Sequence, residues 1–156
     1  MSLVKRDLKT NVNVPGSITD TSDAPVDSVS VTNRTSVLFI VHCYEQLSGA
    51  AATNFDFTGA GAITEIRCTI NNTRTEDGTF YLTSTAINAG HYPSYEDLSE
   101  GKFTMLIDFS AAAINTALGS DDIIAAYMEF SWKDNNDVAQ MLMSLPMGIK
   151  AKLQES

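Results

Sequence analysis

The sequence lacks the features that mark several large classes of protein. It has only two cysteines, Cys43 and Cys68, which are too few for a scaffold held by disulfides. Its apolar runs, such as residues 37–41, are all far shorter than the roughly 20 residues that a membrane-spanning helix needs. The start MSLVKRDLKTN has no apolar stretch typical of a secretory signal. We therefore predict free, buried thiols and a chain that neither binds nor crosses a membrane.

Positive charge is also scarce. Ten Lys and Arg residues stand against 19 Asp and Glu residues, which gives a formal net charge of −9. Binding to a phosphate backbone requires clustered Lys and Arg, so we do not expect a nucleic-acid partner. The hydrophobic share of 44% and the charged share of 19% are typical of a globular domain that buries a sizeable core.

Motifs for catalysis and for metal binding are missing. There is no Gly-rich phosphate loop, no nucleophile elbow and no zinc motif. His42 and Cys43 are adjacent, but neighbouring residues of a strand point to opposite faces and cannot form a pair. The acidic clusters at 20–23, 121–122 and 134–137 lack the spacing of a calcium loop and are better explained by turns. The sequence leaves a glycosidase pair open among carboxylates on separate predicted strands, namely Glu65, Asp108 and Glu129. We predict no enzyme, no cofactor and no metal.

The first 32 residues differ from the rest of the chain. They contain no Phe, Tyr or Trp and are rich in Thr, Ser, Asn, Asp and Val. The runs 12–14 and 29–31 could add edge strands, but nothing in this segment promises a core. We therefore predict a polar N-terminal arm at 1–32 and a β-sandwich domain at 33–156.

From Ser36 onward, apolar residues alternate as they do in strands. SVLFIVHCY is apolar on both faces, which indicates a central strand covered on both sides or a subunit contact. AITEIRCTI alternates cleanly and predicts a half-buried strand. Further strands are predicted at TFYLTS, KFTMLIDF, DIIAAYMEFSW and VAQMLMSL, with Pro146 marking a bulge or strand break. SAAAINTALG predicts one short helix near Ala111–Leu118.

These elements predict an all-β fold, an antiparallel β-sandwich of Ig-like or jelly-roll-like type with one short helix. Its core is expected to contain the inward residues of the predicted strands: Phe39, Val41, Ile66, Cys68, Phe103, Ile107, Met128 and Phe130.

The stretch NFDFTGAGAITEIRCTI places an aromatic cluster directly before a strand. Phe55 and Phe57 have strand-like spacing, so both rings can anchor the end of the preceding loop in the core. Asp56 or Thr58 can cap the turn, and Gly59 supplies the freedom to change direction. We interpret the cluster as a structural corner rather than a ligand site.

A second aromatic group lies in the loop after the TFYLTS strand. His91, Tyr92 and Tyr95 are candidates for contact with a partner protein or a glycan, and so is Trp132. The competing interpretation is a packed loop tip. If these side chains are exposed, they favour the alternative function of a carbohydrate-binding β-sandwich module.

The order of elements from about Thr32 to Leu153 resembles the N-terminal domain of bacteriophage tail and baseplate proteins. In that pattern a first strand and a polar loop precede a hydrophobic-D-(L/F)-T-G-A segment, which is Phe55 to Ala60 here. A G-x-F-x-x-x-hydrophobic strand follows at Gly101–Ile107, then a short helix and two further strands. The chain departs from the pattern in its long loop at 84–100, in Phe57 where Leu is commoner, and in its arm.

The resemblance implies a non-enzymatic structural module of a phage or prophage tail or baseplate. Such a module would attach or assemble a fibre or receptor-binding component in the virion, after assembly in the bacterial cytoplasm. Its implied partners are other tail or baseplate proteins and itself, as a trimer or hexamer. The arm and the strand at 37–44, which is apolar on both faces, also predict a homo-oligomer.

Overall fold

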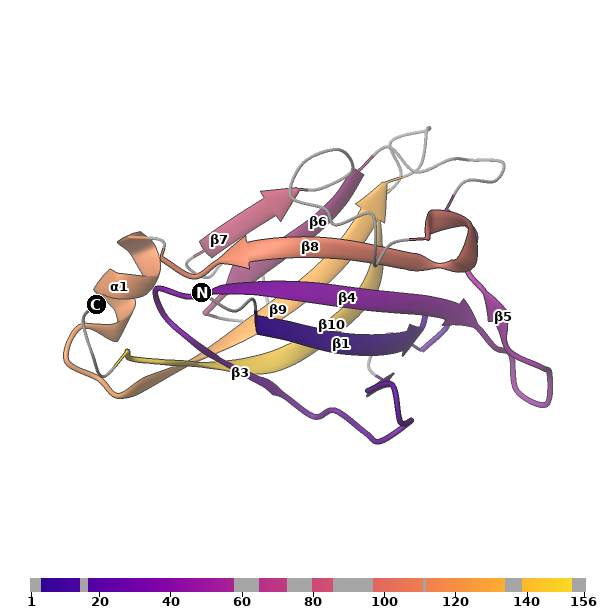
Figure 1. Ribbon diagram of the computed structural model, residues 1–156, viewed down its shortest axis with the longest axis horizontal. Helices are drawn as coiled ribbons and strands as arrows, with labels where there is room; N and C mark the ends of the chain where they lie inside the picture. Colours follow the sequence, from indigo (N-terminus) through magenta and orange to yellow (C-terminus); the bar gives the residue numbers. More distant parts are fainter. Residues whose placement is uncertain are drawn as a thin grey trace.

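The computed structural model describes residues 4–14, 17–57, 65–72, 80–85, 97–110, 112–133 and 139–152. Their strands form two sheets packed face to face, with one short α-helix at one end of the sandwich (Figure 1). The predicted β-sandwich with a single short helix is therefore confirmed for the described part of the chain.

The first sheet is centred on β4 (Ser36–Glu45). On one side β4 pairs in parallel with β1 (Val4–Asn11), which in turn pairs with β2 (Ile18–Thr19). On the other side it pairs antiparallel with β8 (Lys102–Asp108) and, at its C-terminal end, with the short β5 (Thr53–Asn54). Since β4 has partners along both edges, it is the central strand that its sequence predicts.

The second sheet has the order β3 (Val29–Thr32), β10 (Ala139–Lys150), β9 (Ile123–Lys133), β6 (Glu65–Asn71) and β7 (Phe80–Thr85). In this sheet β10, β9, β6 and β7 pair antiparallel with their neighbours, but β3 runs parallel to β10. Both sheets are thus mixed, and the prediction of a wholly antiparallel sandwich is wrong. Alternation shows which face a residue occupies but carries no information about strand direction.

The described residues of the predicted N-terminal arm belong to the sandwich. They supply β1, β2 and β3, and their aliphatic side chains are at most 5% exposed at Leu8, Ile18, Val29 and Val31. The prediction of a polar arm outside the core is wrong for these residues. The physical reason is that aliphatic side chains alternating along short strands suffice to fill a core, and no aromatic ring is needed.

The helix α1 (Ala112–Leu118) lies where the sequence predicts it and buries Ile114 and Leu118. It ends at Gly119, whose φ of +50° is in the left-handed region and whose N–H donates to the carbonyl of Asn115. A 3₁₀ turn, η2 (Leu98–Glu100), precedes β8.

All eight predicted core residues are at most 2% exposed. Pro146 does not break its strand, because β10 continues through it opposite Tyr127 and the register shift lies between Met141 and Met143. On the other edge of β10, β3 pairs only from Met147 onward, so a proline is tolerated at position 146. Both cysteines are free and buried, as predicted.

The sandwich has two unlike ends (Figure 1). The helix end holds α1, the start of β4 and the end of β10. The corner end holds the end of β4, the loop 46–52, β5 and η2. The residues with candidate functions among the described ones gather at the corner end.

Candidate functional site

Aromatic rings fill the interior of the corner end. The ring of Phe57 lies 4.8 Å from that of Phe55 and 6.0 Å from that of Phe103, both edge to face. The ring of Phe55 lies 5.6 Å from that of Trp132, again edge to face. Such geometry adds to the stabilisation that burial of the rings provides. Because Phe103 belongs to the first sheet and Trp132 to the second, the corner ties the two sheets together.

The predicted corner residues fall partly within the described chain. Phe57 is buried and Phe55 is partly buried against the core, which is the packing that the sequence predicts for both rings. Asp56 is exposed, and a capping role for it stays a prediction. Thr58 and Gly59 lie outside the described residues. The described part of the cluster is therefore an anchor for the core.

The backbone packs closely behind these rings at Gly101. This residue has a φ of +79°, and a Cβ built on it would lie 2.2 Å from the carbonyl oxygen of Cys43. The Gly101 carbonyl accepts the N–H of Cys43 at 2.7 Å, and the Cys43 carbonyl accepts that of Phe55 at 3.1 Å. Only glycine combines this φ with this close approach. Residue 101 therefore locks η2, β4 and the corner together.

The outer surface of the corner end carries three basic side chains in one line. In the register of the first sheet, Lys9 of β1 is directly opposite His42 of β4, and His42 is directly opposite Lys102 of β8. Residues paired in this way point to the same face, and the outer face is the one opposite the buried Cys43. At a strand spacing of about 4.8 Å, the two lysine Cα atoms are about 10 Å apart. We call Lys9, His42 and Lys102 the basic row.

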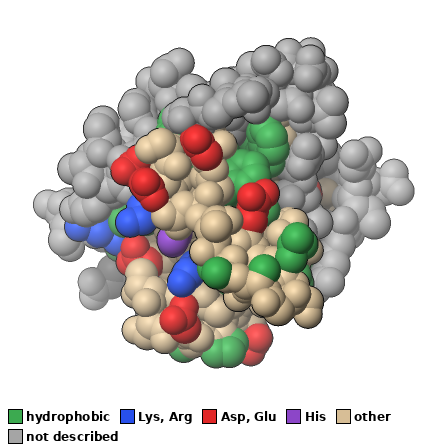
Figure 2. All heavy atoms as spheres, turned by 90° about the vertical axis from the view of Figure 1, so that its right-hand side faces the viewer, with side chains coloured by type: hydrophobic (Ala, Val, Ile, Leu, Met, Phe, Trp, Pro, Cys, Tyr) green, Lys and Arg blue, Asp and Glu red, His purple; other side chains and the backbone are tan. Residues whose placement is uncertain are grey.

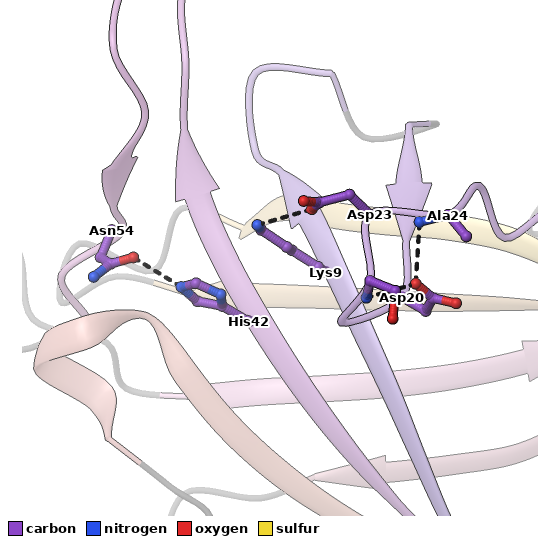
Figure 3. Close-up of polar contacts among 7 residues, drawn as sticks. Lys9, Asp20, Asp23, Ala24, His42 and Asn54 are labelled. Atoms are coloured by element: carbon purple, nitrogen blue, oxygen red, sulfur yellow. Dashed lines mark hydrogen bonds and ion pairs between the residues drawn. The ribbon is translucent and has the colours of Figure 1, made fainter.

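A chain of hydrogen bonds leads from the middle of the row to a carboxylate. The amide nitrogen of Asn54 donates to Glu100 Oε2. The amide oxygen of Asn54 therefore faces His42 Nε2, at 2.8 Å (Figure 3). Because that oxygen can only accept, His42 carries a proton on Nε2. The histidine is thus oriented from β5 and connected indirectly to Glu100.

The end of the row at Lys9 is paired within the chain. Lys9 Nζ lies 3.2 Å from Asp23 Oδ1 (Figure 3). It also lies 5.2 Å from the centroid of the Tyr44 ring. Asp23 has a φ of +61°, and its turn is held by the carboxylate of Asp20, which accepts the N–H groups of Ser22 and Ala24. A loop turn therefore presents the carboxylate that pairs with Lys9.

Figure 2 faces the corner end and shows the Lys, Arg and His side chains towards one side of it, hydrophobic side chains mainly towards the other, and acidic side chains spread over the face. A shallow pocket of about 330 Å³ lies at the hairpin between β4 and β5, and its floor and walls mix small apolar and polar residues. Leu47 at its rim is 68% exposed. The lining residues are Asn13, Glu45, Leu47, Ala50, Ala51 and Thr53.

The structure separates the residues that the sequence analysis grouped as possible partner or glycan contacts. Trp132 is partly buried in the corner, where its ring packs against Phe55 and Phe57. His91, Tyr92 and Tyr95 lie outside the described residues, so a contact through them stays a prediction. The basic row was not predicted, because its members lie far apart in the sequence and only strand register brings them together.

The described ranges contain no group of three or more His, Cys, Asp or Glu side chains that could hold a metal ion. His42 and Cys43 lie on opposite faces of β4, as predicted, and burial raises the pKa of the Cys43 thiol far above its usual range. No helix in the described part of the chain is long and apolar enough to span a membrane.

Comparisons with known proteins give likenesses in fold and none in sequence. No protein-family model matches the chain, and no curated protein matches it by sequence. The fold is similar to a solved structure described as the N-terminal domain of phage TP901-1 ORF48. The likeness has a TM-score of 0.45 at 11% sequence identity and covers 96% of this chain and 99% of that one.

Proposed function

We propose that this chain is a non-enzymatic structural module of a phage or prophage tail or baseplate. It attaches or assembles a fibre or receptor-binding component in the virion, after assembly in the bacterial cytoplasm. The observation that carries the proposal is the segment Phe55 to Ala60 with the strands around it, which follows the pattern of tail and baseplate proteins.

The geometry of the corner end supports such a role. The two aromatic side chains of that segment pack between Phe103 and Trp132, so they stiffen the end of the sandwich and leave its polar side chains on the surface. A rigid end with polar side chains on its surface suits a module that attaches one protein component to another. A fixed interior places the surface groups accurately for a partner.

The proposed partners are other tail or baseplate proteins and further copies of this chain, as a trimer or hexamer. Self-assembly now rests on the resemblance alone. The first 32 residues contribute three strands to the sandwich, and Leu38 on the second face of β4 is fully buried in the single chain. Neither feature needs a second copy to cover it.

The test is the presence of the protein in virus particles. Particles from an induced lysogen that carries the gene are purified by density gradient and examined with an antibody against this chain. We expect gold label at the tail or baseplate and the chain among the particle proteins by mass spectrometry. Absence from intact particles, with the protein detected in the cell lysate, would contradict the proposal. Light scattering of the whole chain checks oligomer formation separately.

A further inference from the structure

We propose that the basic row of Lys9, His42 and Lys102 is the docking site for an acidic segment of a partner protein. Carboxylates of that segment bind Lys102 and displace Asp23 from Lys9. The inference rests on the proposed function, which requires a partner surface, and it specifies where that surface lies and which chemistry it recognises.

The row concentrates positive charge on one face of the first sheet, because two lysines flank a histidine across three strands. The chain has ten Lys and Arg residues against 19 Asp and Glu residues, so acidic neighbours for a lysine are plentiful. The register nevertheless places basic residues in all three positions, which a role in binding anions explains.

The chain compensates the row only in part, and it does so with carboxylates from its own loops. Asp23 reaches Lys9 from an exposed turn and is itself 74% exposed at its side chain. Glu100 reaches His42 only through Asn54. Lys102 has no ion-pair partner among the described residues. Within the described residues, the row therefore binds a polypeptide carboxylate at its Lys9 end and none at its Lys102 end.

These contacts favour a protein segment over a nucleic acid. The carboxylate of Asp23 shows which group fits the row. A phosphate backbone requires a larger cluster of Lys and Arg than the two lysines that the row offers. Acidic residues at positions i and i+2 of an extended segment lie about 7 Å apart on one face. Flexible lysine side chains about 10 Å apart at their Cα atoms can reach both of them.

The experiment measures binding of a fluorescein-labelled peptide of alternating Asp and Ser to the full chain by fluorescence anisotropy at low salt. The control peptide has Asn in place of every Asp. We expect the acidic peptide to bind and the amide peptide not to bind. Lys102→Met should weaken binding about threefold, the size of effect that an exposed ion pair supports. Lys5→Met, the same change on an exposed residue of β1 outside the row, should alter binding less than twofold.

A second pair of variants tests the displacement of the internal carboxylate. Asp23→Asn removes the competitor for Lys9 and keeps a side chain that tolerates a φ of +61°, so the peptide should bind about threefold more tightly. Asp27→Asn removes the same charge from an exposed position away from the row and should leave binding unchanged. Melting curves establish that all four variants fold.

Equal effects of Lys102→Met and Lys5→Met, or of Asp23→Asn and Asp27→Asn, would overturn the assignment of the row. Equal binding of the amide peptide, or no binding of the acidic peptide at millimolar concentration, would overturn it as well. A single-stranded DNA oligonucleotide that binds as tightly as the peptide would also contradict it. Each of these results leaves the presence of the chain in particles untouched, so failure of the docking site and failure of the proposed function can be told apart.

Discussion

Each end of the sandwich is bridged by an asparagine side chain, but the two bridges differ in their access to water. At the helix end Asn33 is 6% exposed, its Nδ2 donates to Asn115 Oδ1 at 2.7 Å, and its Oδ1 accepts the Lys152 N–H at 2.8 Å. At the corner end Asn54 is exposed and also uses both amide atoms, with His42 and Glu100 as partners. The same kind of side-chain bridge is therefore shielded from water at the helix end and accessible to water or a partner at the corner end.

This contrast distinguishes polar groups that stabilise the fold from polar groups that a partner can bind. A buried polar group that loses its partner bears the full cost of desolvation, whereas an exposed one recovers hydrogen bonds from water. The corner end adds a second division, because its interior is an aromatic and backbone lock while its surface is polar. We therefore expect substitutions in the interior of the corner end and in the polar bridge of the helix end to destabilise the protein. Substitutions on the surface of the corner end should have little effect on stability.

The largest expected effect is at the backbone lock of the corner end. Gly101→Ala should lower the free energy of unfolding by about 3 kcal/mol, because a left-handed φ costs an L-residue about 1–2 kcal/mol and the clash with the Cys43 carbonyl adds to it. Gly49→Ala is the matched control, with a φ of +80° and no atom within 4 Å of the new Cβ. It should cost about 1 kcal/mol. Urea denaturation measures both variants, and equal losses would show that the close approach is unimportant.

The second prediction concerns the polar bridge of the helix end. Asn33→Ala should lower the free energy of unfolding by about 2 kcal/mol, because it removes the partner of the Lys152 N–H and of Asn115 Oδ1 in a part-buried site. The measurement is again urea denaturation. A loss below about 0.5 kcal/mol would mean that water replaces Asn33 as readily as it would replace an exposed side chain.

Sequence alone predicted the interior of this fold better than its connectivity. Alternation identified Phe39, Ile66 and Phe130 as core residues because side chains on a strand change face at every step. The helix could be predicted because its alanines favour helical backbone and the glycine after it favours a helix end. The aromatic corner was readable for the same local reason, since the spacing of Phe55 and Phe57 alone allows both rings to turn inward.

The remaining features depend on pairing, which the sequence does not encode locally. The parallel placement of β1 beside β4 turned a segment interpreted as a polar arm into part of the core. The same pairing creates the basic row, whose three members come from three separate strands. Asn33 could not be singled out either, because its partners Asn115 and Lys152 become neighbours only in the folded chain.

Alkaline pH should destabilise the protein more mildly, through the two buried thiols. Burial raises the pKa of the thiols of Cys43 and Cys68, so each stays neutral in the folded protein while the unfolded chain ionises above about pH 8.5. Stability is thus fully present below that pH and falls as the pH rises, by up to about 1.4 kcal/mol per unit for each thiol. Urea denaturation between pH 7 and pH 10 measures the slope.

The Cys43→Ala/Cys68→Ala variant is the control for this slope. It should be less stable at neutral pH, because two buried sulfur atoms are removed, yet its stability should fall less steeply above pH 8.5. An unchanged slope would assign the alkaline loss to other groups. Both cysteines lie next to residues already described: the backbone N–H of Cys43 donates to the Gly101 carbonyl, and Cys68 is paired in register with Phe130.

The smallest effect should come from the exposed bridge. Asn54→Ala should change the free energy of unfolding by less than about 0.5 kcal/mol, because His42 and Glu100 can both turn to water when the amide is lost. Asn33→Ala and Asn54→Ala can be compared directly, because each substitution removes one donated and one accepted side-chain hydrogen bond. Chemical shifts of the His42 ring should move in Asn54→Ala, which establishes that the bridge exists in solution. If its loss instead costs as much as that of Asn33, the corner surface is part of the structural lock, and a partner could not rearrange the basic row without unfolding that end.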